Sequence, residues 1–338
     1  MCILVYLSSC VLLSKELMTV TLHDIQQAAE RINPYIHRTP VLTNESLNER
    51  VGAQVFLKCE NLQKVGAFKF RGACNAVFSL TEKESSRGVC THSSGNHAQA
   101  LTLAAKMRGI PAYIVMPENA ALVKKNAVAS YGGQITFCAP TLEEREATLR
   151  RVYERTGANI VHPYNDERVI AGQGTAVLEL LEDIPDLDVI LAPVGGGGLL
   201  SGTSIAATEM KKGIRVIGAE PEMADDAHRS LQSGVLVPSA NPKTIADGLL
   251  TSLGSLTFPV LQEHVGQIVI VSEQGILEAM KFIWERAKII IEPSAAVAIG
   301  VLWEKKIDLT GSKVGVILSG GNVDLDRLPW IQTEAALQ

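Results

Sequence analysis

The sequence lacks several patterns that would assign it to a particular class of protein. It has no excess of basic residues, because 31 Lys and Arg stand against 36 Asp and Glu and give a formal net charge of -5. This balance excludes the basic surface typical of a nucleic-acid-binding protein. The six cysteines form no C-x-x-C pair, which argues against a zinc knuckle or a disulfide framework and favours a reducing compartment. We therefore predict a cytoplasmic protein that binds neither nucleic acid nor membrane.

The N-terminus also lacks the features of a membrane anchor or a signal peptide. Residues 2–13 are apolar and nearly uncharged, but the run is too short to span a bilayer and has no basic residues before it. Met18 follows closely, and residues 21–24 have the pattern of a capping box that begins a helix. We predict that residues 1–17 are a non-functional extension and that the functional protein begins near Met18.

Apolar segments alternate with helical segments along the 338 residues, a length sufficient for two domains. Continuous β-branched runs that alternate with helices are typical of parallel sheets covered on both faces, so the predicted fold class is α/β. The expected strands span 54–58, 89–92, 112–116, 134–137, 189–194, 214–219, 268–271 and 314–318. The expected helices end near 80 and 107 and then span 119–131, 142–155, 169–182, 199–211, 276–289 and 295–303.

Lys69 is an unusual charge, because Phe68 and Phe70 flank it in the stretch Val-Gly-Ala-Phe-Lys-Phe-Arg-Gly-Ala that begins at Val65. If the side chain is buried at the start of the predicted helix, the ammonium loses hydration, its pKa falls and the amine can attack a carbonyl carbon. A lysine that forms a Schiff base needs this property. The stretch alone is equally compatible with a surface lysine at a helix N-terminus.

Four consecutive glycines, residues 195–198, lie between a predicted strand and a predicted helix. Without Cβ atoms the backbone N–H groups can converge on an anion at the helix N-terminus, and a phosphate is the natural ligand. The dinucleotide-binding fingerprint is not met, because Leu200 stands where its third glycine is required. We predict a phosphate-binding loop, with a merely tight turn as the alternative.

Three further turns follow predicted strands, where ligands bind in parallel sheets. Residues 93–97, Ser-Ser-Gly-Asn-His, offer amides and hydroxyls to a carboxylate, or only cap a helix. Residues 220–226 carry several carboxylates whose oxygens suit Mg²⁺ or Ca²⁺, although an acidic surface loop has the same composition. Residues 319–322, Ser-Gly-Gly-Asn, allow close approach of a ligand and offer a hydroxyl to a ring nitrogen.

Taken in order, these motifs resemble one family. Together with Ala-Glu-Pro-x-x-Ala-Asp-Asp at residues 219–226, they resemble the serine racemase branch of the pyridoxal-phosphate serine/threonine dehydratases over roughly residues 20–330. The resemblance is strongest to the threo-3-hydroxyaspartate dehydratases and the microbial serine racemases. It implies a tryptophan synthase β-like (type II) fold with two domains, each a mainly parallel sheet flanked by helices. Residues 18–80 with 166–338 would form the large cofactor-binding domain, and residues 81–165 a small domain that closes over the active site.

The resemblance also implies how the cofactor, pyridoxal phosphate, is held. Lys69 would carry it as a Schiff base and then remove the Cα proton of the substrate. Phe68 would pack on its ring, Asn96 would bond its phenolic oxygen and Ser319 would face its ring nitrogen. The residues that would hold the phosphate and line the cofactor are Gly195, Gly196, Gly197, Gly198, Leu199 and Gly248.

Racemisation requires a second acid/base group, and the Ser94 hydroxyl would supply it. Ordinary threonine dehydratases, by contrast, usually have alanine at this position. The implied ligands of the substrate α-carboxylate are Ser93, Asn96 and His97, with Ser94 beside them. Arg145 matches an arginine that reaches a second substrate carboxylate, although a solvated arginine on a charged helix is a strong alternative.

The resemblance further implies a divalent cation, Mg²⁺ or else Mn²⁺ or Ca²⁺, bound by Glu220, the Ala224 carbonyl and Asp226. It implies a homodimer and makes ATP a candidate activator. Two departures lower the expectation of racemisation as the main activity: Ala67 replaces a serine common in the family, and Tyr164 stands where mammalian racemases have asparagine.

The predicted function is that of a pyridoxal-phosphate ammonia-lyase. It would convert L-serine, L-threonine or threo-3-hydroxyaspartate to a 2-oxo acid and ammonia, with serine racemisation as the alternative or a coexisting activity. Two other hypotheses are a nucleotide-binding or regulatory protein that uses the glycine loop without chemistry, and a β-replacement enzyme similar to cysteine synthase.

Overall fold

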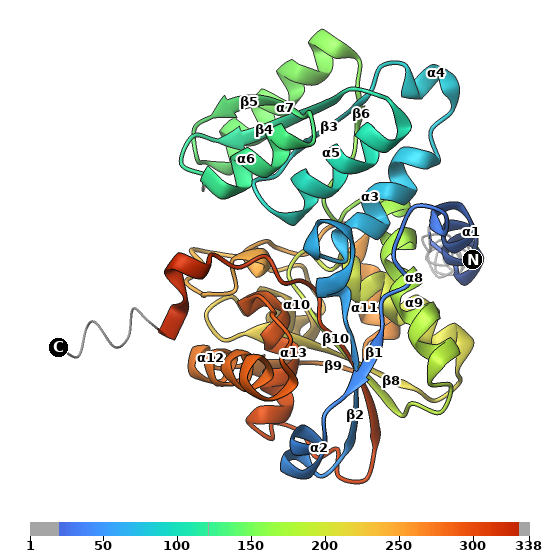
Figure 1. Cartoon of the computed structure of the whole chain (residues 1–338), viewed down its shortest axis with the longest axis vertical. Helices are drawn as coiled ribbons and strands as arrows, with labels where there is room; N and C mark the ends of the chain where they lie inside the picture. Colours follow the sequence, from blue (N-terminus) through green and yellow to red (C-terminus); the bar gives the residue numbers. More distant parts are fainter. Residues whose placement is uncertain (1–19, 121, 331–338) are drawn as a thin grey trace, which may run out of the picture.

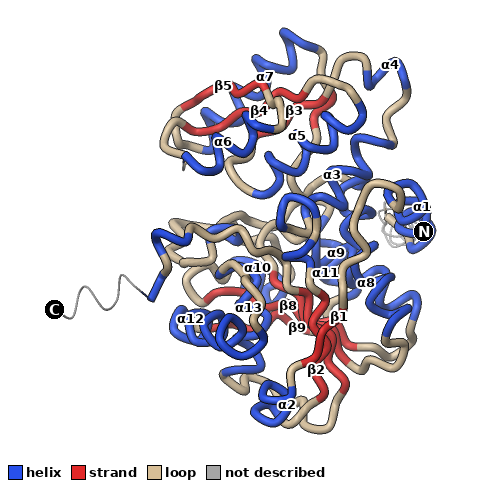
Figure 2. The backbone as a smooth tube through the Cα atoms, in the orientation of Figure 1, coloured by secondary structure: helices blue, strands red, loops and turns tan. Residues whose placement is uncertain are grey.

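The computed structural model describes residues 20–120 and 122–330, which form two lobes, each built on one sheet (Figures 1 and 2). A six-stranded sheet lies in the lower lobe of the view and a four-stranded sheet in the upper lobe. The predicted α/β class is confirmed. The predicted extension, residues 1–17, lies outside the described residues. No helix in the described part of the chain is long and apolar enough to cross a membrane.

The larger sheet has the strand order β1-β2-β10-β7-β8-β9 and is parallel except at β1, which pairs antiparallel with β2. The central strand β7 is buried at every position, as expected of a parallel strand covered on both faces. The strands are β1 (Val41–Thr43), β2 (Gln54–Lys58), β7 (Val189–Pro193), β8 (Arg215–Pro221), β9 (Gln267–Val271) and β10 (Lys313–Ile317).

Helices cover both faces of this sheet. On one face, α12 (Glu273–Phe282) and α13 (Pro293–Trp303) pack against alternate residues of the strands. On the other face lie α1 (Leu22–Ile32), α8 (Glu167–Asp183), α9 (Gly198–Met210) and α11 (Thr257–His264). The strand-to-helix turns therefore meet at one edge of the sheet, which is where ligands bind in such folds.

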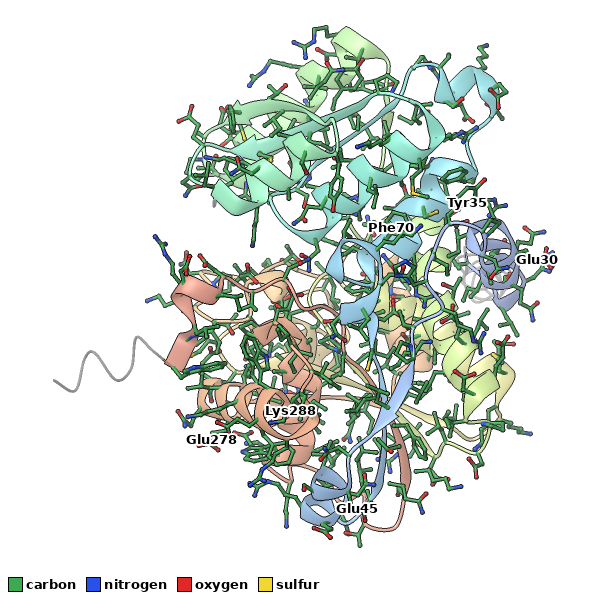
Figure 3. All side chains as sticks on the ribbon, viewed as in Figure 1. Glu30, Tyr35, Glu45, Phe70, Glu278 and Lys288 are labelled. Carbon is green, nitrogen blue, oxygen red and sulfur yellow. The ribbon has the colours of Figure 1, made fainter. Side chains whose placement is uncertain are left out.

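The smaller sheet, β5-β4-β3-β6, is parallel throughout. Its strands are β3 (Val89–His92), β4 (Ala112–Pro117), β5 (Gln134–Cys138) and β6 (Asn159–Ile160). One face packs with α5 (Asn96–Arg108) and α6 (Leu122–Ser130), and α7 (Leu142–Thr156) covers the other. Helix α3 (Lys69–Phe78) packs on α5 and on α8, so it lies between the lobes, where Phe70 and Tyr35 are seen in Figure 3.

The predicted strands agree with the structure to within two residues at each end, and the capping box at Thr21 is confirmed. The predicted helix 276–289 is wrong at its end. Helix α12 stops at Phe282, a π-helical turn spans Ile283–Ala287, and Lys288 takes a left-handed conformation with φ 59° that ends the helix. Short elements escaped prediction, namely β1, β6, α2 (Glu45–Val51), α4 (Glu82–Ser85), α10 (Asp226–Ser233) and α11.

Arg71 lies at the centre of a buried group of charges that connects α3 to the large sheet. Its Nε and Nη2 donate to both oxygens of Glu60, at 2.7 and 2.8 Å. Its Nη1 and Nη2 donate to the two oxygens of Glu179, both at 2.8 Å, and Nη1 also donates to Thr175. Lys58, the last residue of β2, donates to Glu179 at 2.6 Å. Two cations and two carboxylates therefore neutralise one another in a buried site. Buried charges require such pairing.

We expect Glu60→Gln to lower the free energy of unfolding by about 3 kcal/mol, because Arg71 and Lys58 then share a single carboxylate in a buried site. Glu182→Gln is a matched control, since Glu182 pairs with Arg38 at the exposed surface and such pairs contribute less than about 1 kcal/mol. Urea unfolding followed by tryptophan fluorescence measures both variants. Equal losses would contradict the structural role of the buried group.

Candidate active site

Lys69 is the first residue of α3, and the loop before it lies along the turn that follows β10. The Phe68 amide donates to the Ser319 carbonyl at 3.0 Å, and the Gly321 amide donates to the Gly66 carbonyl at 2.9 Å. The structure therefore brings together two of the predicted site residues, Lys69 and Ser319, from opposite ends of the chain.

The Lys69 side chain is half-buried, and its Nζ donates a hydrogen bond to the Pro163 carbonyl at 2.8 Å. The same atom lies 5.0 Å from the centre of the Phe68 ring. Loss of hydration lowers the pKa of Lys69 to about 8, although the nearby Glu292 carboxyl opposes the shift. An amine with this pKa is neutral in an appreciable fraction near neutral pH, so Lys69 is suited to nucleophilic and base chemistry.

The glycine loop, residues 195–198, joins β7 to α9 and leads into the helix N-terminus. Gly197 has φ +88°, a conformation that glycine adopts without strain. A Cβ on Gly195 would lie 2.9 Å from the Cα of Leu249 and 3.4 Å from the Gly248 carbonyl, so the predicted residue Gly248 is adjacent. Thr257 donates to the Gly196 carbonyl at 2.8 Å. The first amides of α9, including that of the buried Leu199, have no acceptor within the helix and are available to an anion.

Residues 93–97 connect β3 to α5. The Ser93 hydroxyl accepts a hydrogen bond from the Gly95 amide at 3.3 Å, and a Cβ at Gly95 would meet open space. Ser94 is half-buried in the same turn. The backbone at Gly95 is therefore open to a neighbouring group, as a loop that contacts a ligand requires.

His97 is buried, and its Nε2 lies 3.2 Å from the Val161 carbonyl. Because a carbonyl only accepts, Nε2 must carry the hydrogen, and the buried Nδ1 is left without a partner among the described residues. Burial, then Lys69, holds the pKa of His97 well below its usual range. The predicted contact of His97 with a carboxylate stays a prediction, and its backbone amide in the first turn of α5 is the donor best suited to it.

Asn96 joins a chain of polar contacts across the site. Its Nδ2 donates to Glu292 at 2.9 Å, and its Oδ1 accepts from Asn322 at 2.9 Å. Asn322 also donates to the Val65 carbonyl, at 2.7 Å. Burial raises the pKa of Glu292 to about 8, and Asp247 adds to the shift. Glu292 was not identified from the sequence, because a glutamate followed by proline is a common pattern at the start of a helix.

The three predicted metal ligands lie together at the end of β8. Glu220 accepts from the amides of Ala227 and His228, at 2.8 and 2.7 Å, and Ala224 lies in the turn before Asp226. Asp226 is 1% exposed, and its Oδ2 has no partner within the described residues. No group of three or more His, Cys, Asp or Glu in the described chain could hold a metal. A cation here would need the Ala224 carbonyl and water in addition to the two carboxylates.

Arg145 lies on α7, and its Nε is buried without a hydrogen-bond partner in the described part of the chain. It is close enough to His92 to affect that imidazole: burial lowers the pKa of His92, the Glu146 carboxylate opposes the shift, and the Arg145 charge adds to it. His162 is also held neutral, because burial lowers its pKa to about 4. Sequence reasoning missed both histidines, which no motif distinguished.

A half-buried lysine beside a glycine loop, at the strand ends of a two-lobed α/β fold, is the architecture of a cofactor-dependent enzyme. The family model described as pyridoxal-phosphate dependent enzyme matches residues 32–320, and the chain belongs to this family. The predicted family and fold are thereby confirmed.

Individual relatives are similar over nearly the whole chain. The chain is 52% identical over 316 residues to the serine racemase of Dictyostelium discoideum, covering 92% of this chain and 97% of that protein. It is 51% identical over 310 residues to the beta-hydroxyaspartate dehydratase of Paracoccus denitrificans (strain Pd 1222), covering 92% and 98%. The solved structure of maize serine racemase is 45% identical, with a TM-score of 0.90 over 94% of this chain and 98% of that chain.

The residues present fit pyridoxal phosphate. Lys69 offers an amine of lowered pKa to the aldehyde, and the glycine loop offers free amides to the phosphate. Ser319 is 3% exposed and adjoins the Lys69 loop, where it can meet a ring nitrogen.

The lowered pKa of Lys69 predicts how capture of the cofactor depends on pH. Burial disfavours the ammonium, so the neutral amine is present at lower pH than on a surface lysine, whose pKa is about 10.4. We expect the rate at which the cofactor-free protein captures pyridoxal phosphate to rise with pH and level off above about 8. Stopped-flow absorbance measures this rate, with Lys64→Ala as the control. A rate still rising at pH 10 would contradict the assignment.

Proposed function

We propose that this protein is an ammonia-lyase that eliminates water from a β-hydroxy amino acid, and that the enamine so formed is hydrolysed by water to a 2-oxo acid and ammonia. The observation that carries the proposal is the Lys69 amine, half-buried at a helix start with a lowered pKa and a single carbonyl partner. The names of the two similar proteins, a serine racemase and a beta-hydroxyaspartate dehydratase, support a substrate of this class.

In this proposal each residue of the site has a distinct role. Lys69 removes the Cα proton with its Nζ. The Ser93 hydroxyl and the first-turn amides of α5 hold the α-carboxylate, because a helix N-terminus attracts anions. Pyridoxal phosphate supplies an electron-withdrawing ring when bound. Ser319 offers that ring a hydroxyl rather than a carboxylate, which weakens the electron withdrawal and favours prompt elimination.

Among the candidate substrates we favour threo-3-hydroxyaspartate. Arg145 supports this choice, because its buried Nε lacks a partner and a guanidinium is suited to binding a carboxylate. L-Serine and L-threonine have no second carboxylate and would gain nothing from this contact.

We expect Arg145→Ala to lower kcat/KM for threo-3-hydroxyaspartate by about 10- to 100-fold, the loss typical of a hydrogen bond between charged groups. For L-serine the change should be small. Arg150→Ala, an exposed arginine of the same helix, is the matched control and should change neither value. Formation of the 2-oxo acid measures all of these rates. Equal losses with both substrates would reject the role of Arg145.

Serine racemisation is the second function we propose, as a coexisting activity. It needs a proton donor other than Lys69, and the Ser94 hydroxyl is half-buried in the turn that faces open space at Gly95. General acid/base groups of this kind contribute about 10²- to 10⁴-fold to rate.

We expect Ser94→Ala to reduce formation of D-serine by about 100-fold or more and to leave elimination largely intact. Lys69→Ala should abolish both reactions, which separates the two roles. D-Serine and 2-oxo acid are measured in the same reaction mixture. Racemisation that survives Ser94→Ala would show that another group donates the proton.

We also propose a divalent cation, Mg²⁺ or else Mn²⁺ or Ca²⁺, at Glu220, Asp226 and the Ala224 carbonyl. The support is that two buried carboxylates adjoin one another and one oxygen lacks a partner. Oxygen ligands of this kind suit hard cations.

We expect chelator to lower the melting temperature by about 1 to 2 °C for each kcal/mol of cation binding lost, and added Mg²⁺ to restore it. Asp226→Asn should remove this response. Asp225→Asn should keep it, since Asp225 pairs instead with Arg229. An unchanged melting temperature in the wild-type protein would overturn the metal site.

Four further expectations stay predictions: the homodimer, the cytoplasmic location, activation by ATP and closure of the small domain over the site. Light scattering of the purified protein tests the first.

A further inference from the structure

Tyr164 lies directly against the glycine loop. A Cβ built on Gly196 would lie 2.3 Å from both Cγ and Cδ1 of the Tyr164 ring and 2.5 Å from Cδ2. A Cβ on Gly198 would lie 2.9 Å from the Cβ of Tyr164. Because real Cβ atoms do not approach other atoms so closely, Tyr164 occupies the space that side chains at these two positions would need.

The Tyr164 ring is held in place from several sides. The His162 ring meets it edge to face, with centres 4.6 Å apart, a favourable geometry for aromatic pairs. His162 Nδ1 accepts from the Tyr164 amide at 3.3 Å and from the Asn165 amide at 2.9 Å. The phenol forms a hydrogen bond with Thr251, and burial raises its pKa, so it stays neutral.

The other two glycines of the loop are required for different reasons. Gly195 packs against the backbone of Leu249. Gly197 has a positive φ, and a Cβ there would lie 2.8 Å from Thr257. Of the four positions, only Gly196 and Gly198 are restricted by Tyr164, and this difference provides a matched control.

We propose that Tyr164 is a positioning residue for the cofactor phosphate, because its ring sets the path of the loop whose amides bind that group. This inference rests on the proposed assignment of residues 195–198 as the phosphate loop. The preceding residue, Pro163, accepts the hydrogen bond of Lys69. The short segment from His162 to Tyr164 therefore contacts both the Lys69 amine and the glycine loop. Its position fixes the distance between the amine and the loop.

The test is a rescue experiment on cofactor affinity, measured by titrating cofactor-free protein with pyridoxal phosphate and following absorbance. We expect Gly196→Ala to weaken binding by about 10- to 100-fold, because the new methyl group overlaps the ring. Tyr164→Ala should weaken binding by about tenfold, and Tyr164→Phe, which keeps the ring, by less than about fivefold. The double variant Gly196→Ala with Tyr164→Ala should bind as Tyr164→Ala does, since neighbouring substitutions are not additive.

Gly197→Ala is the control, and Tyr164→Ala should not rescue it. The proposal is overturned if the double variant binds no better than Gly196→Ala, if Tyr164→Ala binds as the wild type does, or if Gly197→Ala is rescued as well. The melting temperature of each cofactor-free variant shows that it is folded, and it should follow the same pattern of rescue.

A separate comparison tests the phosphate assignment. Pyridoxal, which lacks the phosphate, should lose little affinity in Gly197→Ala, whereas pyridoxal phosphate should lose much. Equal losses would show that residues 195–198 do not bind phosphate. In that case the rescue seen in melting temperature would still report on the contact between Tyr164 and Gly196, so the two failures are distinguishable.

Discussion

The buried charges around Arg71 are the interaction on which the rest of the site depends. Arg71 follows Lys69 by two residues on α3, so the contacts that hold its guanidinium also set where the amine lies. Only a planar group with five N–H donors can engage Glu60 and Glu179 through both oxygens of each. Strand β2, through Lys58, the turn after it, through Glu60, and α8, through Glu179, thereby determine the start of α3.

The two lobes meet at the site through polar side chains. Asn96, at the start of α5, bonds to Glu292 and Asn322 of the large-sheet lobe. Lys124 of α6 forms an ion pair of 2.6 Å with Asp247, beside Gly248. Such contacts are directional and can be exchanged for water, unlike the apolar packing of α3 on α5. These polar contacts therefore link the two lobes at the site, in addition to the apolar packing of α3 on α5.

Much of the fold could be predicted from local patterns. The strands β2 and β3 agree with prediction to the residue, because each contains β-branched or aromatic residues and is followed by a polar turn. The end of α12 could not be predicted. Lys288 adopts a left-handed conformation, and no sequence pattern indicates this for lysine, which usually favours helix. The residues at the strand ends, Lys69, Ser93–His97 and Ser319, were identified by their composition. The contact of Tyr164 with Gly196 depends on how the two sheets are arranged, which no local pattern reports.

Three imidazoles, the buried His97 and the half-buried His92 and His162, have a consequence for the dielectric character of the site. Burial lowers the pKa of His92, His97 and His162, so all three rings stay uncharged at neutral pH. The three rings are polarisable but neutral, and the raised pKa of Glu292 keeps that carboxyl mostly protonated as well, so neither offsets the positive charge of the Lys69 ammonium. Coulomb interactions are several times stronger in such surroundings than in water. A small zwitterion that enters such a site is therefore oriented by its carboxylate, which the Lys69 ammonium attracts, before any bond is made or broken.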